Sequence, residues 1–191
     1  GAALVLDIAT GEILAMASLP AFDPNNVAAS LQSTDAPFIN RALSGYNIGS
    51  VFKLAVACAA LEGGISASYP YVCQGFIDVE GQVFRCNNHA VHGPLSMAKA
   101  LEVSCNTYFI HLAQQMDPGF LLAVCRHLGL GEESELAPGL TAQAGNLPTL
   151  KELSSPAALA NFSFGQGSSL ATPLQIARIV SIIGNDGAAI T

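Results

Sequence analysis

Ser50 and Lys53 form the pattern in this sequence that most suggests chemistry, because a lysine follows a serine by three residues. The apolar, alanine-rich stretch 54–61 comes directly after them and ends at two glycines. Such a stretch predicts a buried helix that stops at the glycines. Ser50 is then expected at or just before the first helical turn, with Lys53 on the same face one turn later.

This spacing would suit nucleophilic catalysis. A serine hydroxyl is a poor nucleophile until a neighbouring base takes its proton. A lysine among apolar groups loses hydration of its ammonium form, so its pKa falls and its amine can accept that proton. The Ser50 N–H, at the start of the helix, could donate to a developing oxyanion. The alternative is a chance Ser-x-x-Lys, since so short a motif arises easily in 191 residues.

A second polar pattern, Ser104-Cys105-Asn106, interrupts two predicted helices at about 95–103 and 107–115. Its hydroxyl and amide could complete a site around the first pair. The simpler interpretation is that Ser104 caps the second helix and Asn106 fills a turn. The sequence by itself leaves both interpretations open.

Two cysteines and two histidines cluster in the middle of the chain, at Cys73, Cys86, His89 and His92. One interpretation is a zinc site. Another is a disulfide between Cys73 and Cys86, which flank a predicted hairpin. The third is two unpaired thiols and two surface histidines. The cysteines at 58 and 125 lie within helix patterns and are expected to be buried.

The composition limits the possible classes of function. Apolar residues make up 51% of the chain, charged residues 11%, and the net charge is −7 without a basic run. A nucleic-acid partner is therefore not expected. No apolar stretch is long enough to cross a bilayer, and no signal peptide is recognised. Because the chain starts abruptly in a strand-like run at Gly1, we expect it to be the interior of a longer protein.

The remaining patterns predict short elements that would position these side chains. Residues 2–8 and 12–18 read as a hairpin around Gly11, and residues 76–79 and 82–84 as a second one. Asp117-Pro118 and Thr172-Pro173 each begin a helix. The other expectations are a short helix over 27–33, loop over most of 131–158, and a turn at 185–187 leading to a strand that ends at Thr191.

Longer stretches of the sequence resemble class B penicillin-binding proteins, the monofunctional peptidoglycan D,D-transpeptidases. Both short motifs match the first two active-site motifs of penicillin-recognising serine enzymes. The similarity extends over LVLDIATGEILAMASLPAFDPNN (4–26), NRAL (40–43), SCNTYF (104–109), FGQG (164–167) and TPLQIAR (172–178).

The resemblance implies a fold, a mechanism and a location. The fold would be α/β (α+β), with an antiparallel sheet flanked by helices in one domain over residues 1–191. Ser50 would attack the penultimate D-Ala carbonyl of a stem peptide, and Lys53 would take its proton. Ser104 would relay a proton to the leaving D-alanine, while Asn106 would hold the substrate and Lys53. The protein would need no cofactor, bind β-lactams and other cell-wall synthesis proteins, and work at the extracytoplasmic membrane face through an anchor N-terminal to Gly1.

Two departures from the family pattern lead to alternatives. Ile48 replaces a usual proline, and the third motif, Lys-Thr-Gly or Lys-Ser-Gly, is absent from the 191 residues. The chain is therefore expected to be a domain truncated before its last strands. A β-lactamase or β-lactam sensor of the same fold is one alternative, and a non-catalytic scaffold of the cell-wall machinery is another.

Overall fold

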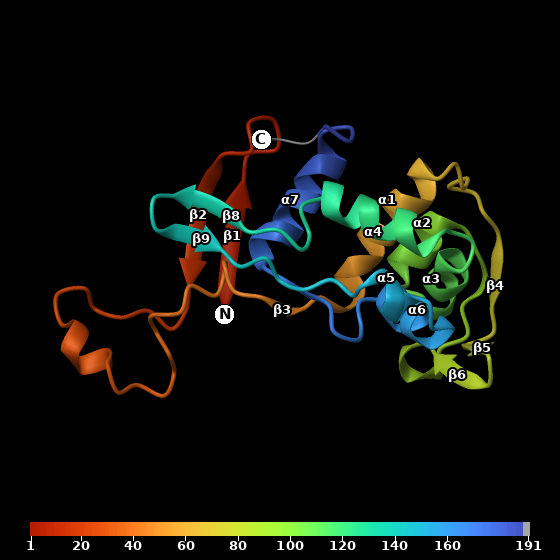
Figure 1. The fold of residues 1–191 in the computed structure, drawn as a ribbon, viewed down its shortest axis with the longest axis horizontal. Coiled ribbons are helices and arrows are strands. Elements are labelled where there is room, and N and C mark those ends of the chain that lie inside the picture. Colours follow the sequence, from red (N-terminus) through yellow and green to blue (C-terminus); the bar gives the residue numbers. More distant parts are fainter. Residues whose placement is uncertain (189–191) are drawn as a thin grey trace. The chain divides into compact units, whose positions relative to one another are not determined.

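The first element of the computed structural model, which describes residues 1–188, is the predicted hairpin (Figure 1). Strand β1 (Ala2–Leu6) pairs antiparallel with β2 (Ile13–Ser18). The Asp7 carboxylate accepts hydrogen bonds from the N–H groups of Ala9 and Thr10, at 2.9 and 2.8 Å. Gly11 has a φ of 75°, which glycine adopts without steric cost. The turn therefore follows from local sequence.

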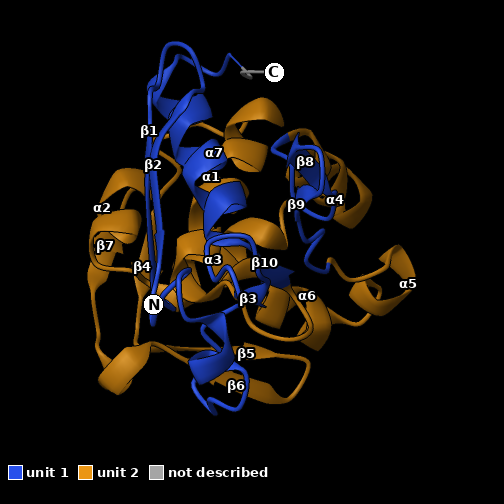
Figure 2. Cartoon of the chain, turned by 90° about the vertical axis from the view of Figure 1, so that its left-hand side faces the viewer, with its two compact units in different colours: residues 1–46, 128–146, 170–191 blue, residues 47–127, 147–169 orange. Residues whose placement is uncertain are grey.

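The chain divides into two units, coloured separately in Figure 2. The first comprises residues 1–46, 128–146 and 170 onward, and the second comprises 47–127 and 147–169. Strand β3 (Tyr46–Asn47) lies where the chain passes from the first unit to the second. Besides β1 and β2, the first unit holds a 3-10 turn (Val27–Ser30), β8 (Ser134–Ala137), β9 (Leu140–Ala142), β10 (Leu170–Ala171) and α7 (Pro173–Gly184).

Helix α7 packs against β1 and organises the first unit. Thr172 caps this helix in a reciprocal capping box with Gln175. The Gln175 amide nitrogen lies 3.0–3.1 Å from the carbonyl oxygens of Gly129, Glu132 and Ala144. Gln175 is buried, so its amide group holds the start of the helix against the segment 129–144, which contains β8 and β9. Leu43, Ala142 and Leu174 form the buried core of this unit.

The second unit is largely helical around α1 (Lys53–Glu62), which packs on α3 (Asn106–Ala113) and α4 (Pro118–His127). Alanines on α1 are fully buried, so neighbouring helices approach closely. The other elements of the unit are a 3-10 turn (Gly49–Phe52), β4 (Tyr71–Cys73), β5 (Phe76–Val79), β6 (Gln82–Arg85), a turn (Asn87–His89), β7 (Gly93–Leu95), α2 (Met97–Glu102), α5 (Leu150–Leu153) and α6 (Pro156–Ser163).

The predicted elements are largely confirmed, but one prediction is wrong and one helix begins later than expected. Residues 131–158 are not mostly loop, because they contain β8, β9, α5 and the start of α6. These elements are short, and the signal that could have revealed α5 is its capping box between Thr149 and Glu152. The helix predicted from about 95 begins at Met97, since Gly93–Leu95 pairs with β4 instead.

Two further expectations concern the ends of the chain and the membrane. The strand predicted to end at Thr191 falls on residues 189–191, outside the described part. Within the described part, no helix combines the length and the apolar character that crossing a membrane requires. The pairs β1–β2, β4–β7, β5–β6 and β8–β9 are all antiparallel, in agreement with the expected class of sheet.

Candidate active site

Ser50 lies where the sequence placed it, at the start of the helical segment that continues into α1. Its hydroxyl oxygen is 3.2 Å from the Lys53 amine. The serine is exposed, whereas only 1% of the lysine surface is accessible. The spacing of three residues therefore gives an accessible nucleophile next to a buried amine, which is the arrangement that acyl transfer needs.

The Lys53 amine is the centre of the site. Its nitrogen lies 2.7 Å from the Asn106 carbonyl oxygen, 2.9 Å from the Ser104 hydroxyl and 2.8 Å from the Ser104 backbone oxygen. Lys53 thus joins α1 to the loop between α2 and α3, across about fifty residues of sequence. The second polar pattern is therefore part of the same site and not merely a cap and a turn.

Burial changes the protonation of Lys53. Desolvation lowers the pKa of Lys53 to about 8, against the smaller opposing effect of the nearby Cys105 and Cys86. Within residues 1–188, no hydrogen-bond partner of its amine is a carboxylate that would hold the ammonium form. The buried ring of Phe109, 5.9 Å from the nitrogen, forms part of the apolar surroundings. A fraction of the amine is consequently neutral already near pH 7, and this fraction grows as the pH rises through the pKa.

The loop carrying Ser104 is held in an uncommon backbone conformation. Ser104 has a φ of 50°, in the left-handed region that non-glycine residues rarely adopt. Asn106 begins α3, and its amide nitrogen donates to the Arg85 carbonyl at 3.1 Å. Cys105 caps the helix by accepting from the Tyr108 N–H. Strain of this kind is typical of functional sites and persists where neighbouring contacts enforce it.

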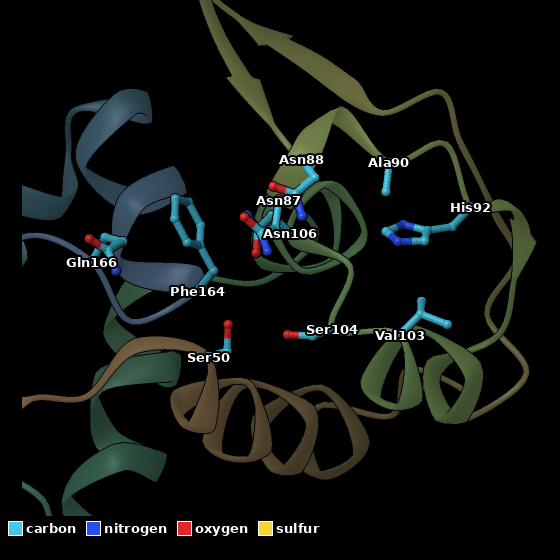
Figure 3. Close-up of a pocket in the computed structure, with 10 residues that line it drawn as sticks. All are labelled: Ser50, Asn87, Asn88, Ala90, His92, Val103, Ser104, Asn106, Phe164 and Gln166. Carbon is cyan, nitrogen blue, oxygen red and sulfur yellow. The ribbon is translucent and has the colours of Figure 1, made fainter.

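The Ser50 and Ser104 hydroxyl groups and the Asn106 amide face one cavity of about 500 Å³ (Figure 3). Ser50 and Ser104 lie together on one side of the cavity. Phe164 and Gln166 lie at one end of it, and His92 lies at the other end. The remaining lining residues are Asn87, Asn88, Ala90, Val103 and Asn106. Among the described residues that line the cavity, His92 is the only one with an acidic or basic side chain, so the cavity suits a largely uncharged peptide segment.

The glycine-rich turn after α6 fixes the approach to Ser50. Gly49 donates its N–H to the Gly165 carbonyl at 3.0 Å. Gly165 has a φ of 77°, and a Cβ atom on it would lie 2.0 Å from the Gly49 carbonyl oxygen. Only glycine allows this approach of two backbones, so the FGQG stretch positions the residue before the nucleophile.

We expect Gly165→Ala to lower the free energy of unfolding by about 2–4 kcal/mol. The backbone at Gly49 would have to move away from the new Cβ, and alanine would be strained at the positive φ of this position. Gly167→Ala is the matched control, since Gly167 has a φ of 90° but nothing within 4 Å. Its expected cost is only about 1 kcal/mol. Urea unfolding of both variants gives the comparison. Equal losses of unfolding free energy in the two variants would show that the close contact with Gly49 does not contribute to stability.

A second group of reactive side chains lies beneath the cavity wall. Donor atoms of Cys73, Cys86, His92 and Cys105 all lie within 4.8 Å of one another. Of the four residues considered as a zinc site from the sequence, Cys73, Cys86 and His92 belong to this group, whereas His89 is exposed and outside it, and Cys105 takes its place. Hydrogen bonding with Cys105 lowers the pKa of the Cys86 thiol, which favours its thiolate form.

The distances between the sulfur atoms fit a bound metal better than a disulfide. Cys86 Sγ is 3.7 Å from both Cys73 Sγ and Cys105 Sγ, and His92 Nδ1 is 3.4 Å from Cys73 Sγ. A disulfide requires about 2.05 Å. Zinc–sulfur bonds of about 2.3 Å at tetrahedral angles place two sulfurs about 3.8 Å apart, and a sulfur and a nitrogen about 3.5 Å apart. These three distances match the edges of such a tetrahedron, and the remaining pairs of donor atoms lie within 4.8 Å of each other.

Comparisons with known proteins agree with this fold and site. The whole chain, residues 1–191, matches the family model described as penicillin binding protein transpeptidase domain. It is 32% identical to the peptidoglycan D,D-transpeptidase MrdA of Acinetobacter baumannii, over 98% of this chain and 31% of that protein. It is 31% identical to stage V sporulation protein D of Bacillus subtilis, over 97% of this chain and 28% of that protein.

Solved structures give the same result. The D,D-transpeptidase domain of a peptidoglycan glycosyltransferase from Eggerthella lenta superposes with a TM-score of 0.89 at 29% identity, over 99% of this chain and 50% of that one. A ceftriaxone acyl-enzyme of penicillin-binding protein A from M. tuberculosis superposes with a TM-score of 0.88 at 29% identity. The match covers 98% of this chain and 45% of that one.

The chain belongs to the penicillin binding protein transpeptidase domain family. The resemblance to class B members is confirmed, and so is the expected fold class. The chain spans about a third of the length of the curated relatives it matches, 31% in the case of MrdA.

The structure unites all four residues that the sequence singled out for catalysis, namely Ser50, Lys53, Ser104 and Asn106. Sequence reasoning missed Cys105 as a member of the thiol cluster and Phe164 as part of the cavity wall. The signal that could have revealed Cys105 was its place between Ser104 and Asn106. The signal for Phe164 was the adjacent glycine-rich turn.

Proposed function

We propose that this chain is the acyl-transfer part of a peptidoglycan D,D-transpeptidase. The observation that carries the proposal is the Lys53 amine, which contacts the Ser50 hydroxyl, the Ser104 hydroxyl and the Asn106 amide oxygen at 3.2, 2.9 and 2.7 Å. A buried amine shared by two serines can take a proton from one and return it through the other. The names of the relatives, among them MrdA, point to the same reaction.

The steps follow from these contacts. Neutral Lys53 removes the Ser50 proton as the oxygen attacks the carbonyl of the penultimate D-Ala in a stem peptide. The Ser50 N–H, in the first helical turn, donates to the oxyanion. Ser104, hydrogen-bonded to Lys53, passes the proton to the leaving D-alanine. An amine from a neighbouring strand then attacks the acyl-enzyme, and the reverse proton path frees Ser50.

The same chemistry predicts inhibitors, location and partners. A β-lactam would acylate Ser50 as a stem peptide does; penicillin-binding protein A of M. tuberculosis has been solved as a ceftriaxone acyl-enzyme. Peptidoglycan is assembled outside the membrane, so we place the protein on the extracytoplasmic face. Partners would be other cell-wall synthesis proteins, as in the complex of a Helicobacter pylori penicillin-binding protein with MreC.

Penicillin turnover tests this function. A transpeptidase core should give one covalent adduct per chain that survives for many minutes, detected by intact-mass spectrometry. Multiple turnovers with release of hydrolysed penicillin would identify a β-lactamase instead. Absence of an adduct on a folded chain, judged by circular dichroism, would favour a non-catalytic scaffold. Release of D-alanine from a D-Ala-D-Ala peptide would then establish the natural reaction.

Asn106→Asp provides a sharp test of the role of Lys53. The new carboxylate would replace an amide oxygen that lies 2.7 Å from the amine. A negative charge at that distance favours the ammonium form and raises the pKa of Lys53 by about 1–3 units. We expect the midpoint of the pH profile of Ser50 acylation to move upward accordingly, with slower reaction at pH 7. An unchanged midpoint in a folded variant would exclude Lys53 as the titrating base.

We also propose that Cys73, Cys86, His92 and Cys105 hold one zinc ion. The observation that favours it is the agreement of their spacings with a tetrahedral site, described above. Elemental analysis of the purified chain should give about one zinc per molecule. We expect His92→Asn to abolish stoichiometric binding and His89→Asn to preserve it. Loss of zinc in the His89 variant, or a ratio near zero in the parent, would contradict this site.

A further inference from the structure

We propose that the thiol cluster is a redox-sensitive site, in which a disulfide between Cys73 and Cys86 forms once the metal has been lost and slows acylation of Ser50. The proposal rests on the zinc site and the acyl-transfer function given above. It adds a regulatory reaction of the same residues, and the partner in that reaction is a disulfide oxidant.

The cluster anchors two backbone segments that line the cavity in strained conformations. Cys105 lies between Ser104 and Asn106, and Ser104 has a φ of 50°. Asn88 and His89 have φ values of 50° and 54° in the loop between Cys86 and His92. Such conformations persist only when the surroundings enforce them. A metal bound to Cys105, Cys86 and His92 would therefore hold both strained segments at the cavity.

Three contacting thiols provide an alternative to the metal. The sulfur of Cys86 lies 3.7 Å from that of Cys73, so a disulfide needs an approach of about 1.7 Å. Both cysteines flank the β5–β6 hairpin, where Cys86 donates its N–H to Gly75 and Gly75 donates to the Cys73 sulfur. Closing this pair needs movement at the end of β4, where Cys73 pairs with Gly93 of β7, and at the open end of the β5–β6 hairpin.

Cys105 is the less suitable partner although it is equally near Cys86. Its sulfur accepts the N–H of Tyr108 at 3.4 Å and so caps α3. Drawing it into a disulfide would disturb the cap of the helix that begins at Asn106. We therefore assign the disulfide to Cys73 and Cys86, which leaves Cys105 and His92 as two ligands, too few for a structural zinc site.

The chemistry is thiol–disulfide exchange. The thiolate of one cysteine attacks a sulfur of the oxidant disulfide and displaces one thiol. The second cysteine then attacks the mixed disulfide, displaces the other thiol and closes the Cys73–Cys86 bond. The protein loses two electrons and two protons, and the oxidant gains them as two thiols. His92 lies between the cavity and Cys73, since it lines the former and contacts the latter.

Oxidised glutathione provides the test. Zinc-loaded chain and chain stripped with a chelator are each incubated with it, and the products are analysed by intact mass, peptide mapping and zinc content. We expect the stripped chain to lose two thiols and give a cross-linked 73–86 peptide, while the loaded chain resists. Acylation of Ser50 by a fluorescent penicillin should be about tenfold slower in the oxidised chain. Dithiothreitol followed by zinc should restore it.

Two variants sharpen the comparison. Cys58→Ser removes a half-buried thiol outside the cluster and should behave as the parent does. Cys73→Ser should give no disulfide and no oxidant-dependent slowing; the peptide map of the parent decides the pairing if this variant fails to fold. Equal oxidation with and without zinc, a disulfide at Cys105, or unchanged acylation after oxidation would each overturn the proposal. Acylation of Ser50 in the reduced, zinc-loaded chain by the fluorescent penicillin is measured first. If this acylation does not occur, the acyl-transfer function fails, and that result is distinct from a failure of the redox proposal.

Discussion

Replacement of Ser50 by alanine is expected to abolish covalent labelling of the chain by penicillin. The hydroxyl is the accessible nucleophile beside the Lys53 amine, 3.2 Å away, and alanine offers no oxygen to attack the carbonyl. Removal of a serine nucleophile in other enzymes lowers kcat by about 10⁶-fold. Intact mass after incubation should show one adduct on the parent and none on the variant.

The control for this experiment is Ser168→Ala. Ser168 is an exposed serine that does not line the cavity, so its loss should leave the labelling of Ser50 intact. An adduct that persists in the Ser50 variant would mean that another residue is acylated. Peptide mapping would then find the residue, and the assignment of Ser50 as the nucleophile would be withdrawn.

The second large effect is expected for Lys53→Arg. Arginine keeps the positive charge and can reach the same oxygen atoms, but its guanidinium stays protonated and cannot accept the Ser50 proton. Loss of a general base typically lowers a rate by about 10²–10⁴-fold. Rates of acylation by a fluorescent penicillin should fall within that range. A small effect would mean that Lys53 acts through its charge and not as a base.

The parent should show the matching pH dependence. Because desolvation lowers the pKa of Lys53 to about 8, the amine is mostly protonated at pH 7 and mostly neutral above pH 9. Acylation should therefore rise about tenfold between pH 7 and its plateau, with a midpoint near the same value. The Lys53→Arg variant should lose this rise. Circular dichroism across the range shows whether folding contributes.

Local sequence determined the elements that hold the nucleophile. The glycine-flanked, alanine-rich stretch after Ser50 could only form a buried helix, and i to i+3 spacing then placed Lys53 beside Ser50. Proline and capping residues likewise defined the starts of α4 and α7. These features depend on contacts within a few residues, which is why a single sequence was sufficient to predict them.

Only the tertiary structure decided what the second motif and the cysteines do. Lys53 meets Asn106 across 53 residues, and Cys105 meets Cys86 across 19, so no local rule predicts either contact. His89 appeared to be a metal ligand because spacing alone cannot tell which side a loop residue faces. His89 is exposed, and Cys105, from the loop between α2 and α3, completes the cluster instead. The sequence was sufficient to identify side chains capable of chemistry. Which of these side chains contact one another was decided by the packing of distant segments.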